Sequence, residues 1–532
     1  MKLSRKEFLR LSLAGGAGLF LPFGVFGCGG LTAGNNSAQG SAGALRKSAA
    51  RLPEPFTIPL PIPPVLKPVH TDASAEYYQI TQKVGRAEIL PGLKTEVWGY
   101  DGIFPGPTIE ARRGRQTIIR HRNELPVPTV VHLHGGKTPP EHDGYPTDVV
   151  MPVGSRESGH GNHGEHAELN VIGEGTFDYK YPMDQSAATL WYHDHRLDFT
   201  GPQVYKGLAG FHLVRDEEEE ALGLPAGERD VPLMICDRAF AEDGSFDYPS
   251  LDPSLKGEPG VEGEYMSGVL GDCILVNGAP WPVLEVTNTL YRFRLLNASN
   301  ARRYRLALDS PPQEGASFAQ IGSDGGLLAK PMNHDKIEMA QAERFDVVVD
   351  FSTYPVGTEV TLINEFGVDC TAKVMRFVVA REGIEESRTP PKLADFRPLS
   401  RSEATVQREF RFVRGAAKID GMTLWTVNGE PFDPDRIDAN PQLNAVELWR
   451  IRGLNREHPI HIHLAPFQVL TSGGGNKGAG PYNQGWKDTV SLDSGGEAEL
   501  LIKFDGYRGK YVFHCHNLEH EDMMMMANFE VV

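Results

Sequence analysis

Four short segments of this chain repeat the pattern His-x-His: HLH (His132, His134), HDH (His193, His195), HIH (His461, His463) and HCH (His514, His516). Each lies in an apolar, β-branched run that is typical of a strand. Side chains alternate between the two faces of a strand, so each pair directs both imidazoles to the same side. One such pair would need no special explanation. Four pairs together are explained economically only by a metal cluster, for which imidazole suits copper, zinc, iron and nickel.

The last pair encloses a cysteine in the segment YVFHCHNLEHEDMMMM, residues 511–526. On a strand, Cys515 faces away from its two neighbours, so one strand can hold a thiolate-bound metal on one side and an imidazole cluster on the other. A single thiolate with two histidines and a more distant methionine is typical of blue copper. The expected ligands of this copper are Cys515, His458, His520 and axial Met525. The remaining methionines of the run are expected to serve local packing: Met523, Met524 and Met526.

Short β-type runs such as CILVNG, YRFRLLN, FDVVVDF and AVELWRI dominate the rest of the chain, with Gly- and Pro-containing turns between them. This pattern predicts an all-β protein of sandwiches or barrels. A phrase with an NG or PG turn followed by a strand of alternating basic and apolar residues recurs three times. We therefore predict three related β-domains, at residues 55–216, 228–380 and 404–532. The acidic run Glu217–Glu220, at the first boundary, is expected to be a solvated surface.

Composition limits the functions that the chain can have. Its 532 residues are 40% hydrophobic and 23% charged, which suits about two to four globular domains. The formal net charge of −17 argues against nucleic acid as a main partner.

The first residues are typical of an export signal, with a basic stretch up to Arg10 and an apolar, glycine-containing stretch from Leu11 to Phe26. The segment SRKEFLR resembles a twin-arginine signal in which Lys6 replaces the second arginine. VFGC resembles a bacterial lipobox, so Cys28 is a candidate for lipidation, with simple cleavage or an uncleaved anchor as alternatives. We predict an export signal at 1–27 and a flexible tether at 28–54. The protein would then reside in the periplasm or at the cell surface, with a membrane tether if Cys28 carries lipid.

The small number of cysteines limits the number of disulfides that the chain can form. The five cysteines are at positions 28, 236, 273, 370 and 515. If Cys28 carries lipid and Cys515 binds metal, at most one disulfide can form among the other three. We expect a Cys273–Cys370 disulfide and a buried free thiol at Cys236; the alternative is three unpaired buried thiols.

The four histidine clusters resemble the copper motifs of multicopper oxidases, and the chain from about residue 75 onward resembles the type with three cupredoxin domains. The likeness to bacterial spore-coat laccases and bilirubin oxidases extends to GLAGFHLVRDE, QIGSDGGLL, AERFDVVVDF and HCHNLEHED. The resemblance implies three consecutive cupredoxin-like Greek-key β-barrel or sandwich domains. It also implies four copper ions: one type 1, one type 2 and a type 3 pair.

Carried over position by position, the resemblance implies the following ligands. The type 1 copper would have His458, Cys515, His520 and Met525. The type 2 copper would have His132 and His461. One type 3 ion would have His134, His193 and His514, and the other His195, His463 and His516.

Two acids match positions of the family that lie near these coppers. Asp143, eleven residues after His132, corresponds to the acid near the type 2 copper, and Glu521 to the acid near the oxygen-binding pair. Reduction of O2 to water consumes protons, which a carboxylate near the cluster can supply. The alternatives are a turn residue in an Asp-Gly pair for Asp143 and an acceptor for a ligand imidazole for Glu521.

The implied activity is laccase-like: one-electron oxidation of phenolic, aminophenolic or bilirubin-like small molecules, coupled to four-electron reduction of O2 to water. Cys515 would then also be catalytic, as the covalent link between the two copper sites. The alternatives are a metallo-oxidase acting on Cu(I), Fe(II) or Mn(II) in copper tolerance, and a non-catalytic cupredoxin scaffold. His160, His163 and His166, in a Gly-rich segment, are expected to lie on a polar surface loop, with a labile copper site as the alternative.

Overall fold

The structure, a computed structural model, describes residues 41–155, 169–419, 422–473 and 478–532. The predicted export signal, Cys28 and the loop with His160, His163 and His166 lie outside the described residues. Of the described residues, 46% lie in strands and 7% in helices, so the predicted all-β class is confirmed. None of the helices in the described ranges has the length and apolar character needed to cross a membrane.

A first set of strands lies between residues 70 and 215. One sheet has the order β10-β6-β3-β2, with β4 paired to β3, and the other has the order β5-β12-β11-β7. Apolar side chains from both sheets, such as Ile80, Ile119 and Leu190, are fully buried in a common core. The strands are β2 (His70–Thr71), β3 (Ala75–Ala87), β4 (Thr95–Tyr100), β5 (Ile109–Arg112), β6 (Gln116–Asn123), β7 (Val131–His134), β8 (Asp148–Met151), β9 (Asn170–Glu174), β10 (Thr176–Tyr181), β11 (Ala188–Asp194) and β12 (Ala209–Arg215).

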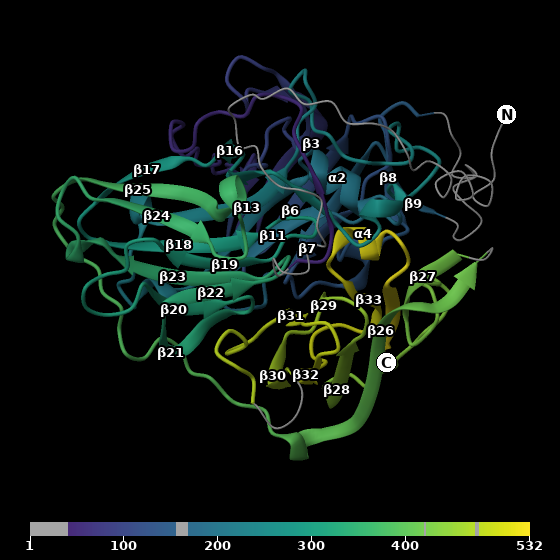
Figure 1. Ribbon diagram of the computed structural model, residues 1–532. Coiled ribbons are helices and arrows are strands. Elements are labelled where there is room, and N and C mark those ends of the chain that lie inside the picture. Colours follow the sequence, from purple (N-terminus) through teal and green to yellow (C-terminus); the bar gives the residue numbers. More distant parts are fainter. Residues whose placement is uncertain (1–40, 156–168, 420–421, 474–477) are drawn as a thin grey trace.

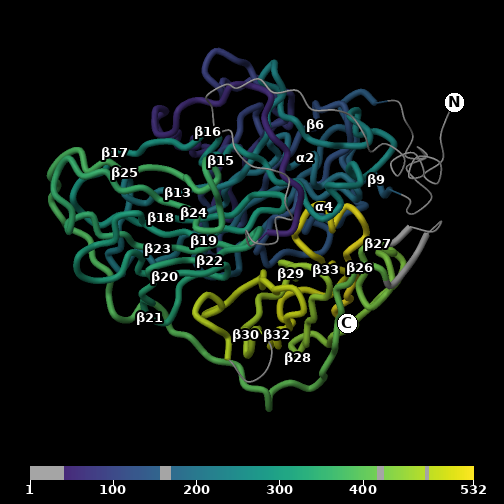
Figure 2. The backbone as a smooth tube through the Cα atoms, in the orientation of Figure 1, coloured from purple at the N-terminus to yellow at the C-terminus, as the bar shows by residue number. Residues whose placement is uncertain are grey.

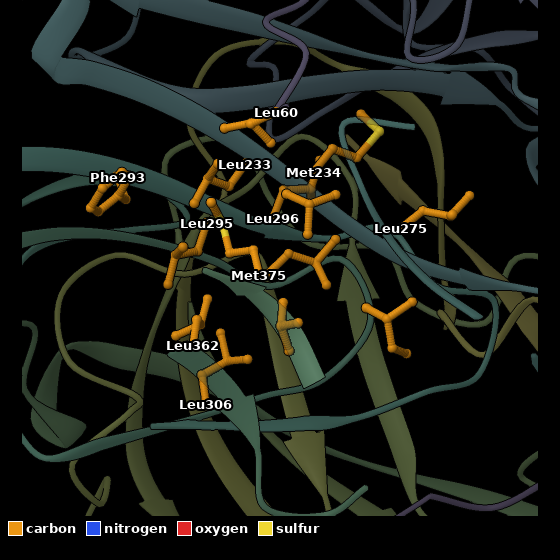
Figure 3. Packing of buried hydrophobic residues seen from close by; sticks show 14 of the residues in the cluster. Leu60, Leu233, Met234, Leu275, Phe293, Leu295, Leu296, Leu306, Leu362 and Met375 are labelled. Atoms are coloured by element: carbon orange, nitrogen blue, oxygen red, sulfur yellow. The ribbon is translucent and has the colours of Figure 1, made fainter. Parts of the chain in front are cut away.

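A middle set of strands lies between residues 230 and 381. A seven-stranded sheet, β16-β15-β13-β18-β23-β20-β21, is joined by a five-stranded sheet, β17-β25-β24-β19-β22. Leu233 and Leu295 of the first sheet and Leu306 and Leu362 of the second lie in one buried cluster (Figure 3). The strands are β13 (Asp230–Arg238), β14 (Val269–Gly271), β15 (Cys273–Val276), β16 (Ala279–Pro280), β17 (Val283–Thr287), β18 (Leu290–Asn297), β19 (Tyr304–Leu308), β20 (Phe318–Ser323), β21 (Gly326–His334), β22 (Lys336–Met339), β23 (Arg344–Asp350), β24 (Glu359–Asn364) and β25 (Lys373–Arg381).

A third set of strands occupies residues 404–531. It contains a five-stranded sheet, β27-β26-β28-β32-β30, and a four-stranded sheet, β31-β29-β33-β34. Trp449 and Phe513 lie in the buried cluster of this set. The strands are β26 (Ala404–Ile419), β27 (Met422–Val427), β28 (Val446–Gly453), β29 (His458–Ile462), β30 (Phe467–Ser472), β31 (Thr489–Leu492), β32 (Glu497–Lys503), β33 (Gly509–Cys515) and β34 (Met526–Val531).

The three sets lie against one another, with β7 and β11 of the first set above β29 and β33 of the third near the centre of the view (Figure 1). The segment from β25 to β26 passes along the lower edge of the molecule (Figure 2). The helices of the described residues are few and short: η2 (Pro140–His142), α2 (Thr200–Lys206), α3 (Glu217–Glu220), η3 (Gly227–Arg229), η4 (Gly263–Tyr265), η5 (Phe351–Thr353), η6 (Asp369–Ala372), η7 (Arg401–Glu403) and α4 (Leu518–Glu521).

The predicted tether differs from the structure over residues 41–54. Strand β1 (Ala44–Arg46) pairs in parallel with β14. Arg46 forms an ion pair with Asp247, with Nε 2.8 Å from Oδ2, and Ser48 donates to Asp272 at 2.5 Å. Leu60, predicted to belong to the first domain, lies in the core cluster of the middle set. Small residues predicted flexibility here, but strand pairing and ion pairs fix this segment to the middle set.

The acidic run is only partly the solvated surface that we expected. Glu219 is 5% exposed. Its carboxylate contacts the buried guanidinium groups of Arg292 and Arg294 on β18. Buried cations require a counter-charge, and the run supplies it from the segment that joins the first and middle sets.

The predicted disulfide is wrong, because Cys273 is a free thiol. The predicted free thiol at Cys236 is confirmed, and it is buried beside Cys273 in the core cluster of the middle set. Cys370 is not free, so three unpaired thiols do not describe the chain either.

Candidate metal centres

A triangle of donor atoms surrounds the thiol of Cys515; we call Cys515, His458 and His520 the thiol triangle. His458 Nδ1 lies 3.4 Å and His520 Nδ1 3.5 Å from Cys515 Sγ, and the two nitrogens are 3.3 Å apart. A point at the centre is about 2.0 Å from each atom, close to the length of a metal–nitrogen bond. One thiolate and two imidazoles in a trigonal arrangement fit a blue-copper site. The donor set therefore fits copper.

Local structure sets the orientation of each donor in the thiol triangle. His458 is the first residue of β29, and its Nε2 lies 3.3 Å from Leu454 O. His520 lies in α4, whose N-cap, Asn517, accepts a hydrogen bond from the His520 N–H. All three side chains are fully buried. Burial raises the pKa of the Cys515 thiol, so a bound cation is needed to stabilise its thiolate.

Met525 lies against this triangle. Its N–H donates to His520 O at 3.1 Å, and its carbonyl accepts from the Cys515 N–H at 3.1 Å. The side chain is fully buried, in the same apolar cluster as Cys515. The packing role predicted for the other methionines is confirmed, because each lies in a buried apolar cluster: Met523 in that of the third set, and Met524 and Met526 beside Tyr145 and Leu197.

The eight histidines of the four His-x-His pairs form a second site, which we call the histidine cluster. The first set supplies four of them, from β7, the end of β11 and the residue after it. The third set supplies four, from the ends of β29 and β33 and the residue after each strand. The pairing register places His193 opposite His132 and His461 opposite His514. None of the eight side chains is more than 1% exposed: His132, His134, His193, His195, His461, His463, His514 and His516.

One pair of imidazoles links the two sheets. His132 Nε2 and His461 Nε2 are 3.3 Å apart. Their other nitrogens are held by main-chain carbonyls: His132 Nδ1 lies 2.6 Å from Asp143 O, and His461 Nδ1 lies 2.9 Å from Asp488 O. An Nδ1–H that donates to a carbonyl leaves Nε2 free to bind a metal. This pair fits the type 2 position implied by the sequence.

The structure divides the other six histidines differently from the sequence-based assignment. His514 Nε2 lies 3.2 Å from His195 Nε2 and 3.3 Å from His463 Nε2. The ring of His516 lies instead beside those of His134 and His193, with centroids 5.0 and 5.3 Å apart. The predicted grouping of His514 with His134 and His193, and of His516 with His195 and His463, is therefore wrong. Strand alternation gives the side on which both imidazoles lie, but only the β29–β33 register decides which one meets which partner.

The second of these groups also has the character of a metal site. His134 Nδ1, His193 Nε2 and both nitrogens of His516 are buried without a hydrogen-bond partner among the described residues. Buried polar nitrogens are costly when they are unsatisfied. Nitrogens aimed at a bound metal ion are satisfied by it, so the group fits a ligand set.

Asp143 holds two imidazoles from different strand sets. Its Oδ2 lies 2.6 Å from His463 Nδ1, and its main-chain O faces His132. Thr138 donates to Oδ1 at 3.0 Å. Burial raises the pKa of Asp143 to about 8, against the lowering effect of Thr138. Asp143 does lie in a turn, but its contacts exclude a role as a turn residue alone.

Glu521 lies between two histidines of one group. Its Oε2 is 3.0 Å from His514 Nδ1, and its Oε1 is 3.6 Å from His195 Nδ1. Burial would raise the pKa of Glu521, but the neighbouring His514 and His195 hold it below the ordinary value. The carboxylate can therefore orient both rings and accept their protons.

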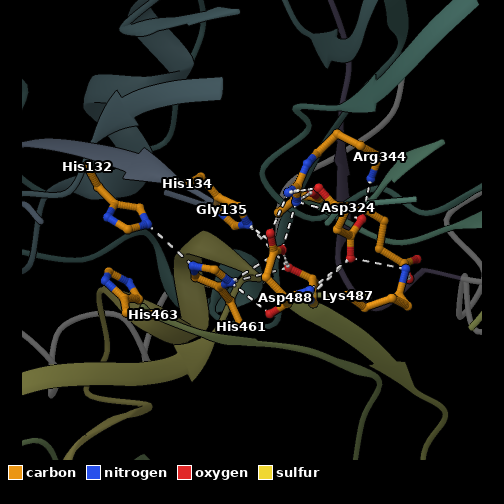
Figure 4. A network of polar contacts seen from close by, with 12 residues as sticks. His132, His134, Gly135, Asp324, Arg344, His461, His463, Lys487 and Asp488 are labelled. Carbon is orange, nitrogen blue, oxygen red and sulfur yellow. Dashed lines mark hydrogen bonds and ion pairs between the residues drawn. The ribbon is translucent and has the colours of Figure 1, made fainter. Parts of the chain in front are cut away.

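A third acid, Asp488, was missed by the sequence reasoning. Its Oδ1 lies 3.0 Å from His134 Nε2 and 2.7 Å from Arg344 Nη1 of β23, in the middle set. Figure 4 shows this network between the histidines and Arg344. The neighbouring Lys487 is buried too, with Nζ 3.1 Å from Asp324. A Lys-Asp-Thr segment carries no metal signal, so only the tertiary contact identifies Asp488.

Gly135 leaves the space in which the ion pair between Arg344 and Asp488 lies. At φ +84° it has a left-handed conformation that favours glycine. A Cβ here would lie 2.7 Å from Arg344 Nη2 and 2.8 Å from Asp488 Oδ2. The residue after His134 must therefore be glycine for Arg344 to reach the cluster.

Comparison with known proteins gives consistent matches. Sequence profiles described as multicopper oxidase match residues 81–160, 161–219 and 402–532. A laccase of Bacillus stratosphericus is 37% identical, over 90% of this chain and 99% of its own. A bilirubin oxidase of Albifimbria verrucaria is 36% identical, over 89% and 81%. The crystal structure of a laccase from Pediococcus acidilactici has a TM-score of 0.76 and 32% identity, over 92% of this chain and 95% of its own.

These matches cover most of the chain, including all ten histidines of the two sites and Cys515. The two sites also have donor sets that fit copper. The chain belongs to the multicopper oxidase family, as a copper-dependent oxidoreductase that uses O2 as its electron acceptor.

Proposed function

We propose that the protein is a laccase-like oxidase of phenolic, aminophenolic or bilirubin-like molecules, with four-electron reduction of O2 to water. The observation that carries the proposal is the position of Cys515. Its side chain belongs to the thiol triangle, while the adjacent His514 and His516 belong to the histidine cluster. Names of the relatives, laccase and bilirubin oxidase, support this substrate class.

The proposal assigns four copper ions. Type 1 copper would be held by His458, Cys515, His520 and Met525, and type 2 copper by His132 and His461. The type 3 pair would be held by His195, His463 and His514, and by His134, His193 and His516. When bound, these ions accept single electrons and deliver four of them to O2.

Residues of the chain orient the imidazoles of the histidine cluster and carry protons to the site of O2 reduction. Four reductant molecules each lose one electron and one proton, and O2 takes up four of each to form two waters. Asp143 and Glu521 are the proposed proton carriers, because their carboxylate oxygens contact the imidazoles of the histidine cluster. Both side chains are buried, which keeps bulk water from competing for these contacts.

The test is oxygen consumption by the copper-loaded protein with 2,6-dimethoxyphenol, bilirubin and Cu(I) as separate reductants. We expect uptake of one O2 for every four phenols and a blue absorption band from the thiolate. Formation of hydrogen peroxide in place of water would contradict the proposed O2 reduction. Faster turnover of Cu(I) than of either organic reductant would favour the metallo-oxidase alternative.

Export remains part of the proposal. The basic and apolar stretches before Cys28 support export to the periplasm or cell surface, where lipid on Cys28 would tether the protein to a membrane. Fractionation of cells that express the full chain, with and without Cys28→Ala, tests both points. Oxidase activity in the cytosol alone would contradict export.

A further inference from the structure

His520 of the thiol triangle is in contact with a side chain that the middle set holds in place. Trp425 of β27 stacks on the His520 ring, with centroids 3.6 Å apart and planes at 27°. The indole N–H donates to Met266 O at 3.0 Å. Met266 belongs to residues 265–271, which contain β14, and we call this segment the platform. Both His520 and Trp425 are fully buried, so the platform supports one side of the imidazole through a packed aromatic ring.

Glu519, the residue before His520 in α4, binds the middle set directly. It is 1% exposed, and it belongs to neither the thiol triangle nor the histidine cluster. Tyr248 Oη and Asn300 Nδ2 donate to Oε1, both at 2.9 Å, and the Val269 N–H of the platform donates to Oε2 at 3.1 Å. A buried carboxylate is costly unless it is hydrogen-bonded. These donors therefore fix the position of Glu519 and, through one peptide bond, that of His520.

Strand β1 supports two of these three donors. Its parallel pairing with β14 places Ala44 opposite Val269, which donates to Oε2. Arg46 forms an ion pair with Asp247 through two contacts of 2.8 Å, and Asp247 is the neighbour of Tyr248, which donates to Oε1. Residues that were predicted to be a flexible tether thus lie next to the donors of both oxygens of the buried carboxylate.

We propose that β1 positions His520 through the platform and Glu519, so that Glu519 is a positioning residue for copper at the thiol triangle. This inference rests on the proposed function, which assigns a copper ion to that triangle, and it gives the N-terminal strand a role there. Groups outside the ligand set orient the ligands of a metal and tune its affinity and reduction potential. A shift of α4 would change the 3.5 Å separation of His520 Nδ1 and Cys515 Sγ, and the hydrogen bonds to Glu519 oppose such a shift.

Other contacts already fasten the start of the described chain to the middle set. The Ser48 hydroxyl donates to Asp272 at 2.5 Å, and the Ser48 N–H donates to the same carboxylate at 2.9 Å. Ser41 Oγ accepts a hydrogen bond from the Arg303 N–H at 2.9 Å. None of these three hydrogen bonds involves the platform or α4. Ser48→Ala is therefore the matched control, because it changes a contact of the same segment without touching the path to Glu519.

The first experiment measures the affinity of the thiol triangle for copper, by competition with a chelator and with the blue absorption band as the readout. Glu519→Gln places an amide NH2 against at least one of the three donors, and we expect the affinity to fall roughly tenfold. Arg46→Met removes the ion pair with Asp247, which should lower the affinity about two- to fivefold. Arg46→Lys should restore most of this loss, and Ser48→Ala should leave the affinity unchanged. The reduction potential of the site should shift in the same order of variants.

The variant that combines Arg46→Met with Glu519→Gln tests whether β1 acts through the carboxylate. The effects of independent contacts on a free energy add, whereas those of contacts along one path do not. We expect the combined variant to match Glu519→Gln alone. A loss of affinity equal to the product of the two single losses would overturn the inference, because β1 would then act by another route. Equal affinities of Arg46→Met and the wild type would overturn it as well.

Hydrogen exchange in the copper-free protein tests the same path without a metal. We expect the main-chain amides of the platform and of α4 to exchange about two- to fivefold faster in Arg46→Met, with those of β7 and β11 unchanged. Tyr248→Phe, which removes one donor to Glu519 and keeps the ring, should speed exchange in α4 alone. Equal exchange in Arg46→Met and the wild type would overturn the inference. A wild type without a blue band would instead overturn the copper site of the proposed function, and hydrogen exchange would still decide the role of β1.

Discussion

The thiol triangle and the histidine cluster meet at one strand, but they are assembled in different ways. All donors of the triangle come from the third set, and two of them are five residues apart in the chain. The cluster takes four imidazoles from the first set and four from the third. Its orientation depends on three buried acids, and one of these is fixed by Arg344 of the middle set. A site built within one strand set needs outside contacts only to position its donors, whereas a site between sets needs every neighbour in place.

The middle set therefore has a structural part in the chemistry, although it supplies no candidate ligand. Arg344 is fully buried, and it reaches from β23 to Asp488, which contacts His134. Its Nε also donates to Thr189 O of the first set at 3.0 Å. One guanidinium thus joins all three strand sets beside the histidine cluster.

The largest expected effect separates the two sites completely. In Cys515→Ser the thiol triangle loses its thiolate, so the blue absorption band should disappear. Turnover of organic reductants should fall by more than the roughly 10- to 100-fold that loss of an outer partner costs. Copper bound by the histidine cluster should remain, as measured by electron paramagnetic resonance. Loss of all copper would show that the two sites are not independent.

The next test removes the support from the middle set. Arg344→Met leaves the buried carboxylate of Asp488 without its partner, which should lower the free energy of unfolding by about 3–5 kcal/mol. Urea unfolding of the copper-free protein measures this change. Adding Asp488→Asn should restore part of the stability, because no unpaired charge then remains.

The matched control for this test is Arg305→Met, in the same strand set. Arg305 is partly exposed, with Nη2 2.7 Å from Glu338 Oε1, so we expect a loss below about 1 kcal/mol. Equal losses in the two variants would show that Arg344 is no more important than a surface ion pair. In copper-loaded Arg344→Met the blue band should persist while cluster copper is depleted.

A smaller effect on turnover is expected at Asp143, which contacts histidines of the first and third sets. Asp143→Asn keeps the size of the side chain and an acceptor for His463, but the amide cannot carry a proton. We expect kcat to fall about 10- to 100-fold with the blue band unchanged, measured by oxygen uptake and absorption. Glu141→Gln, two residues away on the surface, is the control. An unchanged kcat in Asp143→Asn would exclude Asp143 from proton delivery.

His212 is buried outside the two metal centres, so it can be compared with the buried imidazoles of the histidine cluster. His212 on β12 is fully buried, and burial lowers its pKa to about 3. Below pH 6.5 the unfolded chain binds a proton there and the folded chain does not, so stability is present above pH 6.5 and is lost as pH falls toward 3. Its contribution to the slope approaches about 1.4 kcal/mol per pH unit.

His212→Phe should therefore flatten the pH dependence of urea unfolding in the copper-free protein between pH 6.5 and 4. The exposed His70, replaced in the same way, serves as the control and should leave the slope unchanged. If His212→Phe and the wild type have the same slope, the loss of stability at acidic pH arises from the histidine cluster and not from the buried His212.

The smallest expected effect concerns the axial position. Met525→Leu conserves volume, so its cost in stability should stay below about 1.5 kcal/mol. Loss of the thioether should raise the reduction potential of the blue site, measured by potentiometric titration of its absorption band. Met523→Leu, in the same buried cluster, is the matched control. An equal shift in both variants would contradict the assignment of Met525.

Much of the site could be predicted from residue spacing. The donors of the thiol triangle and the eight histidines follow from short motifs, whereas the acids Asp143 and Glu521 were implied by the resemblance to multicopper oxidases. What the motifs did not contain was the partner of each histidine: His514 faces His195 and His463, not the group of His134 and His193. Asp488 was missed because its role depends on residues more than 140 positions away, among them Arg344.

The sequence by itself determined the all-β class, the donor residues and the opposite facing of Cys515 and its neighbouring histidines, because alternation along a strand is a local property. Tertiary structure alone decided the β29–β33 register that divides the histidines, the burial of Glu219 against β18, and the free thiol of Cys273. It also decided that residues 44–46 pair with β14. Each of these depends on contacts between distant segments, whose energies come from burial and charge pairing and leave no periodic trace in the chain.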